Sequence, residues 1–353
     1  MYPASEKRFL NISLITIITL FVLILAGGVV RSSGSGMGCP DWPKCFDKYI
    51  PPTNASELPA NYREKYVEKR VAKNQRFAHM LDVLGYGKMA ERIRNDESIL
   101  KAEEFNALNT WIEYINRLVG VVFGFLLIAC FIYSFTYFRL SKSIFFLSLL
   151  NLFLVGFQGW LGSIVVSTNL MPWLITLHML LAIAILAICI ATYFKARILR
   201  DRHLLTSTPT KYVKIWAMVA MLLTVVQILL GTTVREQVDA LAVAMNNLNR
   251  SEWVSNLGIT FDIHRDLAIL VLIVNIVLFV MVRARYVMKG HQFKYVLAVL
   301  ILIGLQILSG IILSYLALPP VAQTTHLVLA CILFGAQYYL MLLLGRNKLY
   351  SRI

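Results

Sequence analysis

The chain has 353 residues, of which 58% are hydrophobic, and its mean hydropathy is +0.68. This composition excludes a soluble globular domain and predicts a polytopic helical membrane protein. The formal net charge is +15, but the basic residues gather in alternate connections between apolar stretches. That distribution indicates membrane topology, with anionic lipid headgroups as partner, and argues against binding of nucleic acid.

Eight apolar stretches of about 20 residues are each long enough to cross a bilayer as a helix. The first is too long for a cleaved signal peptide, and no small-residue cleavage site follows it, so we interpret it as a true span. We predict spans over residues 9–30, 112–138, 143–166, 173–197, 212–233, 263–284, 293–316 and 321–344.

The basic connections define an orientation. Lysines and arginines precede the first span and gather at 139–142, 195–214, 283–294 and 346–352, whereas 167–172 and 317–321 carry no charge. The positive-inside rule therefore predicts that both termini are cytoplasmic and that the loop 31–111 lies outside. Within that loop, residues 57–104 mix charges with scattered apolar residues. We expect one or two amphipathic surface helices there, forming a solvated insertion without chemistry of its own.

The chain contains a hidden repeat with a constant offset of 148 residues. Asn116-Arg117 recurs as His264-Arg265, and His178 recurs as His326 (264 − 116 = 326 − 178 = 148). Gln158 and Gly162 likewise recur as Gln306 and Gly310. The fold class we predict is all-α, with eight transmembrane helices arranged as two pseudo-symmetric four-helix bundles. The halves are residues 1–205, with the outer loop 31–111, and residues 206–353.

Histidines placed twice at one depth in a membrane indicate a functional site. His178 and His326 each lie six residues after a proline, about 9 Å inside the outer end of their helices, and His264 opens its span. His264 and His326 thus come from different helices at similar depth, as two axial ligands of one haem iron would. For any one of these histidines alone, a hydrogen bond between helices is the plainer interpretation.

Arg117 and Arg265 follow the ligand position in both halves. A guanidinium at the outer interface can pair with a haem propionate, although snorkelling to the interface explains each arginine equally well.

The halves differ where we expect catalysis. Asn116 is a poor iron ligand, so the first half offers only His178 opposite it. Glu113 lies one turn before Asn116, and its counterpart Phe261 is apolar. A carboxylate there can move protons or stabilise positive charge. The alternative is that Glu113 caps its helix or pairs with an interface arginine.

Two of the five cysteines, Cys39 and Cys45, lie close together just outside the first span. They can close a short disulfide in an oxidising compartment, and whether such a bond is structural or redox-active is left open. A zinc site is disfavoured because no further ligands lie nearby. We expect Cys130, Cys189 and Cys331, which lie within spans, to act as small apolar residues.

These segments together resemble the haem A synthase family of the cytochrome oxidase assembly pathway. The resemblance rests on GGVVRSSGSGMGCPDWPKC, EYINRLVG, LHMLLA, DIHRDLA and THLVLA, and it covers all eight spans. It implies oxidation of the carbon-8 methyl group of haem O to a formyl group, through hydroxylated intermediates. It also implies a haem b cofactor on His264 and His326, and substrate haem O near His178 and Glu113. The chain departs from the family pattern at Asn116, where a histidine is usual.

The resemblance further implies a location and partners. The location is a bacterial-type inner membrane, with the haem sites toward the outer face. The partners are haem O, haem O synthase and other cytochrome oxidase assembly proteins, and assembly into oligomers is left open. Two other functions remain: a non-catalytic haem carrier or assembly factor, and a b-type electron-transfer cytochrome. The second fits less well, because all candidate ligands lie at one side of the membrane.

Overall fold

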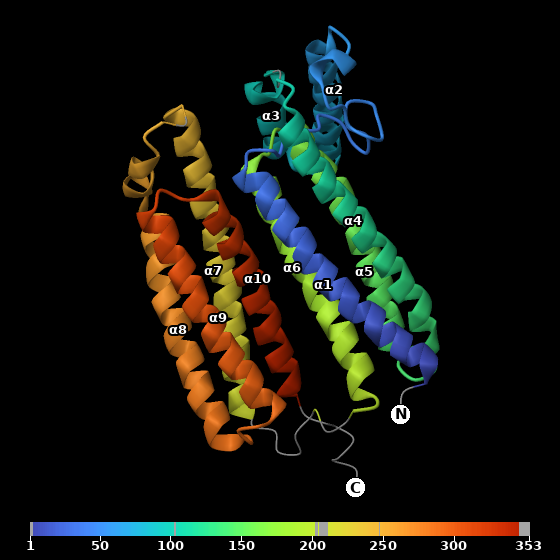
Figure 1. The fold of residues 1–353 in the computed structure, drawn as a ribbon, viewed down its shortest axis with the longest axis vertical. Coiled ribbons are helices and arrows are strands. Elements are labelled where there is room, and N and C mark those ends of the chain that lie inside the picture. Colours follow the sequence, from blue (N-terminus) through green and yellow to red (C-terminus); the bar gives the residue numbers. More distant parts are fainter. Residues whose placement is uncertain (1–2, 102–103, 202–203, 205–210, 247, 346–353) are drawn as a thin grey trace. The chain divides into compact units, whose positions relative to one another are not determined.

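Ten α-helices form nearly all the regular structure of residues 3–101, 104–201, 204, 211–246 and 248–345, the part that the computed structural model describes (Figure 1). Eight of these are long and apolar enough to cross a membrane, which confirms the eight predicted spans and the all-α fold. They are α1 (Ala4–Ser32), α4 (Ala107–Ser134), α5 (Lys142–Ser167), α6 (Pro172–Ile198), α7 (Lys211–Ala244), α8 (Ile259–Arg285), α9 (His291–Tyr315) and α10 (Pro320–Leu343).

Contacts divide the chain into two units. The first contains residues up to Phe21, Phe125–Asn151 and everything from Ile183 onward, and the second contains Val22–Gly124 and Leu152–Ala182. The predicted boundary between the halves, at residues 205 and 206, lies outside the described residues, as do the basic residues Arg202, Arg346, Lys348 and Arg352.

Helices α7 to α10 form an antiparallel four-helix bundle within the first unit. Each packs against two others, since α7 contacts α8 and α10, and α9 also contacts α8 and α10 (Figure 1). Small and branched residues fill the bundle core at one level: Val213, Ala217, Ala220, Val274, Leu278, Val282, Val296 and Leu340. Such a bundle is suited to building a cofactor site from side chains on facing helices.

Helix boundaries follow the offset of the sequence repeat. Shifted by 148 residues, α9 covers 143–167, whereas α5 covers 142–167, and α10 starts at the position of Pro172, the first residue of α6. The connections agree too. Asn169 and Leu170 have φ of 51° and 60°, and Ala317 and Leu318 have φ of 54° and 56°. The two connections therefore share one left-handed turn before a proline that starts the next helix.

The end of α7 differs from the prediction. We expected the span to end near residue 233, but the helix continues to Ala244. Arg235 and Asp239 form an i,i+4 ion pair of 2.8 Å along the extension, and Val238 is buried against Trp253. No proline or glycine interrupts residues 234–244, so the helix extends beyond the apolar stretch.

The helices of the amino-terminal half are joined by polar and aromatic contacts. Within the first unit, Thr16 of α1 contacts Cys130 of α4 at 3.3 Å, and Asn151 of α5 donates to Cys189 of α6 at 2.9 Å. Glu6 is buried and accepts two hydrogen bonds from Arg200, which ties the start of α1 to the segment after α6.

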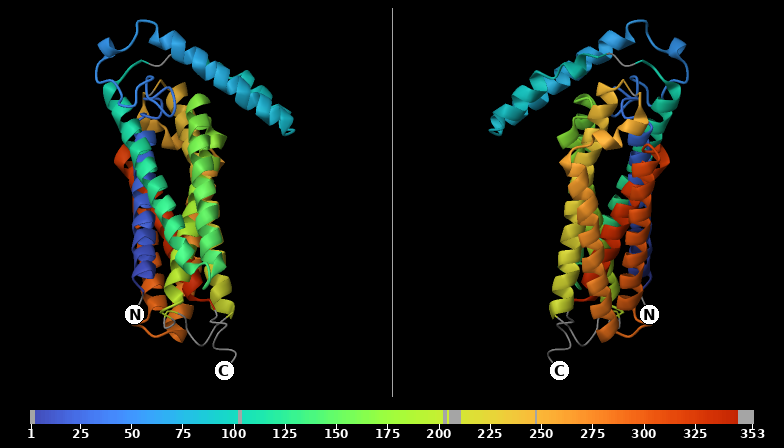
Figure 2. Two further views of the ribbon diagram at one scale, coloured as in Figure 1. Left: turned by 90° about the vertical axis from the view of Figure 1, so that its right-hand side faces the viewer. Right: turned by 90° about the vertical axis from the view of Figure 1, so that its left-hand side faces the viewer.

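The outer loop contains the two expected surface helices, α2 (Tyr62–Val83) and α3 (Gly87–Arg94). Figure 2 shows α2 lying crosswise to the neighbouring parts of α4 and α5, which belong to the same unit. Its apolar face packs on α5 and α6, with Phe77 and Leu81 in one cluster with Leu161. Lys73 donates to the carbonyl of Ser163 at 3.0 Å, and Asn74 to that of Ser167 at 2.7 Å. Asn74 thus satisfies the last carbonyl of α5, which a helix end leaves without an intrahelical partner, and Lys73 bonds to a carbonyl one turn earlier.

Candidate functional site

Two histidine side chains of the α7 to α10 bundle face each other. His264 lies in the second turn of α8 and His326 in the second turn of α10, and their ring centroids are 6.4 Å apart. Two imidazoles that bind one metal from opposite sides at roughly 2 Å each, with a ring radius of about 1 Å, have centroids roughly 6 Å apart. The observed separation is compatible with a metal between the two rings, and haem ligation by His264 and His326 stays a prediction.

Small residues on the neighbouring helices make room for these rings. A β-carbon added to Gly231 of α7 would lie 3.3 Å from the His264 ring, and one added to Gly310 of α9 would lie 3.5 Å from the His326 ring. Ser309 contacts Nδ1 of His326 at 2.8 Å, which leaves Nε2 of that ring for a metal. Sequence analysis did not single out Ser309, because a serine carries no chemical signal without its neighbour.

The same local arrangement occurs around His178. A β-carbon added to Gly162 of α5 would lie 3.3 Å from the His178 ring, and Gln158 donates to the His178 backbone carbonyl at 2.9 Å. In the corresponding position, a β-carbon added to Gly27 of α1 would lie 3.8 Å from Oδ1 of Asn116. The Nδ1 of His178 and the Oδ1 of Asn116 are buried and have no hydrogen-bond partner within the described residues. Such atoms fit a site that a ligand completes.

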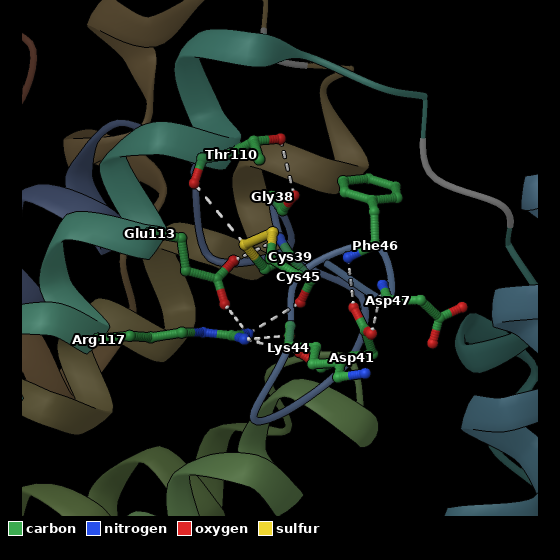
Figure 3. Close-up of a disulfide and its surroundings, with 10 residues drawn as sticks. All are labelled: Gly38, Cys39, Asp41, Lys44, Cys45, Phe46, Asp47, Thr110, Glu113 and Arg117. Carbon is green, nitrogen blue, oxygen red and sulfur yellow. Dashed lines mark hydrogen bonds and ion pairs between the residues drawn. A yellow bond between two sulfur atoms is a disulfide. The ribbon is translucent and has the colours of Figure 1, made fainter. Parts of the chain in front are cut away.

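Glu113 is held by the cysteine loop and by Arg117 (Figure 3). Its Oε1 accepts a hydrogen bond from Nη2 of Arg117 at 2.6 Å, and its Oε2 accepts one from the backbone N–H of Cys39 at 2.8 Å. The Glu113 side chain is only 5% exposed. The carboxylate is therefore fixed in place, and the predicted alternative of an ion pair with an interface arginine is present in the structure.

Arg117 is surrounded by oxygen atoms of the same loop. Its Nη1 donates to the carbonyls of Asp41 and Lys44 at 2.6 and 3.0 Å, and its Nη2 donates to that of Cys39 at 3.0 Å as well as to Glu113 (Figure 3). These four hydrogen bonds leave one of the five guanidinium N–H groups for any other acceptor. Pairing of Arg117 with a haem propionate stays a prediction that must use that remaining group.

The loop itself is closed by covalent and polar links. Cys39 and Cys45 form the predicted disulfide. The Asp41 carboxylate accepts from the backbone N–H groups of Phe46 and Asp47 at 2.6 and 2.9 Å. A β-carbon on Gly38 would lie 2.5 Å from the carbonyl oxygen of Asn109, so only glycine allows the loop this close to α4. The disulfide thus helps to shape the loop whose backbone carbonyls accept hydrogen bonds from Arg117.

Helix α2 is linked to this loop through Asp47. Lys65 and Lys69 contact its carboxylate at 2.8 and 2.5 Å, and Tyr66 donates to it at 3.1 Å. The hydrogen bonds from the two lysines hold the pKa of Asp47 well below its usual range. Further along α2, burial and the nearby Arg117 guanidinium lower the pKa of Lys73.

Arg265, the counterpart of Arg117, is in a different environment. Its side chain is 60% exposed and pairs with Asp262 at 3.3 Å and with Asp266 at 3.2 Å. Exposed ion pairs contribute little to stability, and both a propionate role and an interface role of Arg265 remain predictions.

The chain matches the family model described as cytochrome oxidase assembly protein over residues 11–84 and 86–338. It is also similar to curated proteins named haem A synthase. The protein of Pelagibacter ubique is 25% identical over 98% of this chain and 100% of its own length, and that of Wolbachia pipientis wMel is 25% identical over 94% and 91%. The protein of Shewanella oneidensis is 24% identical over 69% of this chain and 62% of its own length.

Proposed function

The chain belongs to the family of cytochrome oxidase assembly proteins, and we propose that within this family it acts as a haem A synthase. The reaction is oxidation of the carbon-8 methyl group of haem O to a formyl group. Successive hydroxylations of the same carbon give a hydrate, which loses water. Haem O is the substrate, and the protein works as an integral membrane enzyme.

The cofactor in this proposal is a haem b held by His264 and His326. The 6.4 Å separation of their ring centroids supports it, as does the Ser309 contact that orients His326 through Nδ1. A haem held by two histidines supplies one-electron redox chemistry. The protein contributes the orientation of both rings and a helical bundle that surrounds them.

The substrate site in this proposal lies around His178, with Glu113 as the catalytic carboxylate. His178 is the remaining histidine of the repeat, and Gly162 leaves space beside its ring. Glu113 is one helical turn from Asn116 and is fixed by two hydrogen bonds, so its carboxylate keeps one position during the reaction. We assign to Glu113 the uptake of a proton or the stabilisation of positive charge at the substrate edge.

The facing pair His264 and His326 is the single observation that carries the proposal, because it provides a redox cofactor site in a chain whose relatives are named haem A synthase. The test is to express the protein in a host that makes haem O but no haem A. We expect haem A among the extracted haems. Recovery of haem O alone, bound to a folded protein, would identify a haem carrier instead.

A further inference from the structure

A four-residue spacing recurs on the helix that precedes each histidine. Gln227 and Gly231 of α7 face His264, and Gln158 and Gly162 of α5 face His178. In both cases the glutamine Nε2 donates to the backbone carbonyl of the histidine, at 2.6 Å for His264 and 2.9 Å for His178. Gln306 and Gly310 have the same spacing in α9, opposite His326.

This spacing places both side chains on one face of the supporting helix. The glycine lets the histidine ring approach, and the glutamine fixes the backbone from which that ring projects. The glutamine therefore acts as a positioning residue for an axial ligand. Partners of this kind around a metal ligand typically change metal affinity by about 10- to 100-fold.

The fourth copy, formed by α1 and α4, departs at three positions together. Leu23 occupies the glutamine position before Gly27, and Asn116 occupies the histidine position. Gly120 stands four residues after Asn116, where the three histidines are each followed by an alanine: Ala182, Ala268 and Ala330.

Two of these departures lie against each other, and Asn116 lies one helical turn before Gly120 on the same helix. A β-carbon added to Gly120 would lie 3.8 Å from Cδ1 of Leu23, so the leucine packs over the glycine. Leu23 cannot donate a hydrogen bond to the carbonyl of residue 116, as Gln158 does to His178 and Gln227 does to His264. This copy therefore lacks both the histidine and the glutamine hydrogen bond that would support it. Gly120, which is smaller than the alanine of the other copies, lies against the Leu23 side chain.

We propose that Leu23, Asn116 and Gly120 form a matched set that keeps one axial position of the amino-terminal site free of a protein ligand, so that a small uncharged exogenous molecule binds opposite His178. The inference rests on the proposed function in one respect, namely that a haem is held by His178. Asn116 offers a buried amide oxygen without a partner among the described residues, which is suited to a small polar ligand rather than to the iron.

The matched set of Leu23, Asn116 and Gly120 predicts a different result for Asn116→His than an isolated replacement of histidine by asparagine would. If Asn116 were an isolated substitution, Asn116→His alone would restore ligation by two histidines. Because Leu23 stands at the position from which a glutamine supports His178 and His264, we expect full ligation only when Leu23→Gln is added. Residues in contact commonly show such non-additive effects.

The experiment uses the purified, full-length protein loaded with haem at both sites. Carbon monoxide is the probe for an open axial position on reduced haem, and electron paramagnetic resonance measures low-spin haem in the oxidised protein. We expect carbon monoxide to bind one haem of the wild type. The Leu23→Gln/Asn116→His variant should lose that binding and gain a second low-spin signal. Asn116→His alone should bind carbon monoxide at least about tenfold more tightly than the double variant does.

Gln227→Leu provides the matched control at the other site. It removes the same hydrogen bond from His264 while both histidines remain, and we expect haem binding there to weaken about 10- to 100-fold. The low-spin signal of the His264 and His326 haem reports folding in the Leu23 and Asn116 variants.

Two results would overturn the inference. One is a wild-type protein with both haems bound that takes up no carbon monoxide. The other is an Asn116→His variant that matches the double variant. Neither measurement depends on haem A formation. A protein that behaves as expected here but makes no haem A would refute the proposed function and leave the matched set standing.

Discussion

Replacing Glu113 by glutamine separates a catalytic role of this carboxylate from a structural one. The substitution keeps the size and one acceptor oxygen of the side chain but removes its charge. In the structure the two carboxylate oxygens accept from Arg117 at 2.6 Å and from the N–H of Cys39 at 2.8 Å. A glutamine satisfies one of these donors and turns its own N–H₂ group toward the other.

The expected change in stability follows from these contacts. Loss of one hydrogen bond to a charged group costs about 1.5–3 kcal/mol. The larger loss of about 3–5 kcal/mol for a broken buried ion pair does not apply in full, because Arg117 keeps three carbonyl partners. We therefore expect Glu113→Gln to insert and fold with a modestly lower free energy of unfolding. The low-spin haem on His264 and His326 should persist, since both residues lie outside the unit that contains Glu113.

Activity and stability are then measured side by side. Haem extraction from cells that make haem O should show haem O or its hydroxylated intermediate accumulating in Glu113→Gln. Asp41→Asn is the matched control, because it also weakens a charged hydrogen bond of this loop, to Phe46 or Asp47, without touching Glu113. It should lose similar stability and still produce haem A. Normal haem A production by normally expressed Glu113→Gln would refute the catalytic role, and equal losses in both variants would show a structural one.

Three further predictions concern the haem sites and the outer loop. His264→Ala and His326→Ala should each abolish the low-spin b-type spectrum, and retention of an unchanged spectrum by both would refute this cofactor site. Haem held by His178 should be high-spin or weakly six-coordinate and should dissociate more readily than the other, whereas two equivalent bis-histidine signals by electron paramagnetic resonance would contradict this. The lowered pKa of Asp47 means that its contacts with α2 stabilise the loop above the unfolded pKa of about 3.9 and are lost as pH falls below it. Hydrogen exchange in α2 should therefore increase in the wild type as the pH falls below about 3.9. If the Asp47→Asn variant showed the same pH dependence, ionisation of Asp47 would not be its cause.

The spans and the histidine pair could be predicted because each rests on a strong regularity of sequence. Apolar length defines a span whatever its neighbours are, and a constant offset identifies His264 and His326 as equivalents of Asn116 and His178. The disulfide could also be predicted, because Cys39 and Cys45 lie so close in sequence that they cannot be far apart in space.

The rest depends on contacts between segments that no periodicity encodes. From the sequence, a propionate and the interface were equally good partners for Arg117, and Glu113 was a candidate for an ion pair with an arginine. The structure shows that ion pair, but the three loop carbonyls around Arg117 could not be predicted, because any residue type supplies a backbone oxygen. The extension of α7 was not predicted, because we ended the span where the apolar residues end. A helix can continue beyond an apolar stretch through polar residues such as Arg235. Leu23 was not identified from the sequence either, because a leucine in an apolar helix is ordinary until it is compared with the glutamine at the same position of the other copies.

The most direct test of the central claim is the mass of haem extracted from a host that makes haem O and lacks haem A, with and without this protein. The account predicts a haem in which the carbon-8 methyl group has become a formyl group, together with its hydroxylated precursor. A His178→Ala variant, which lacks the histidine of the proposed substrate site, should yield haem O only. Haem O as the only product of the wild type, in protein that carries a low-spin haem on His264 and His326, would contradict the assignment as a haem A synthase.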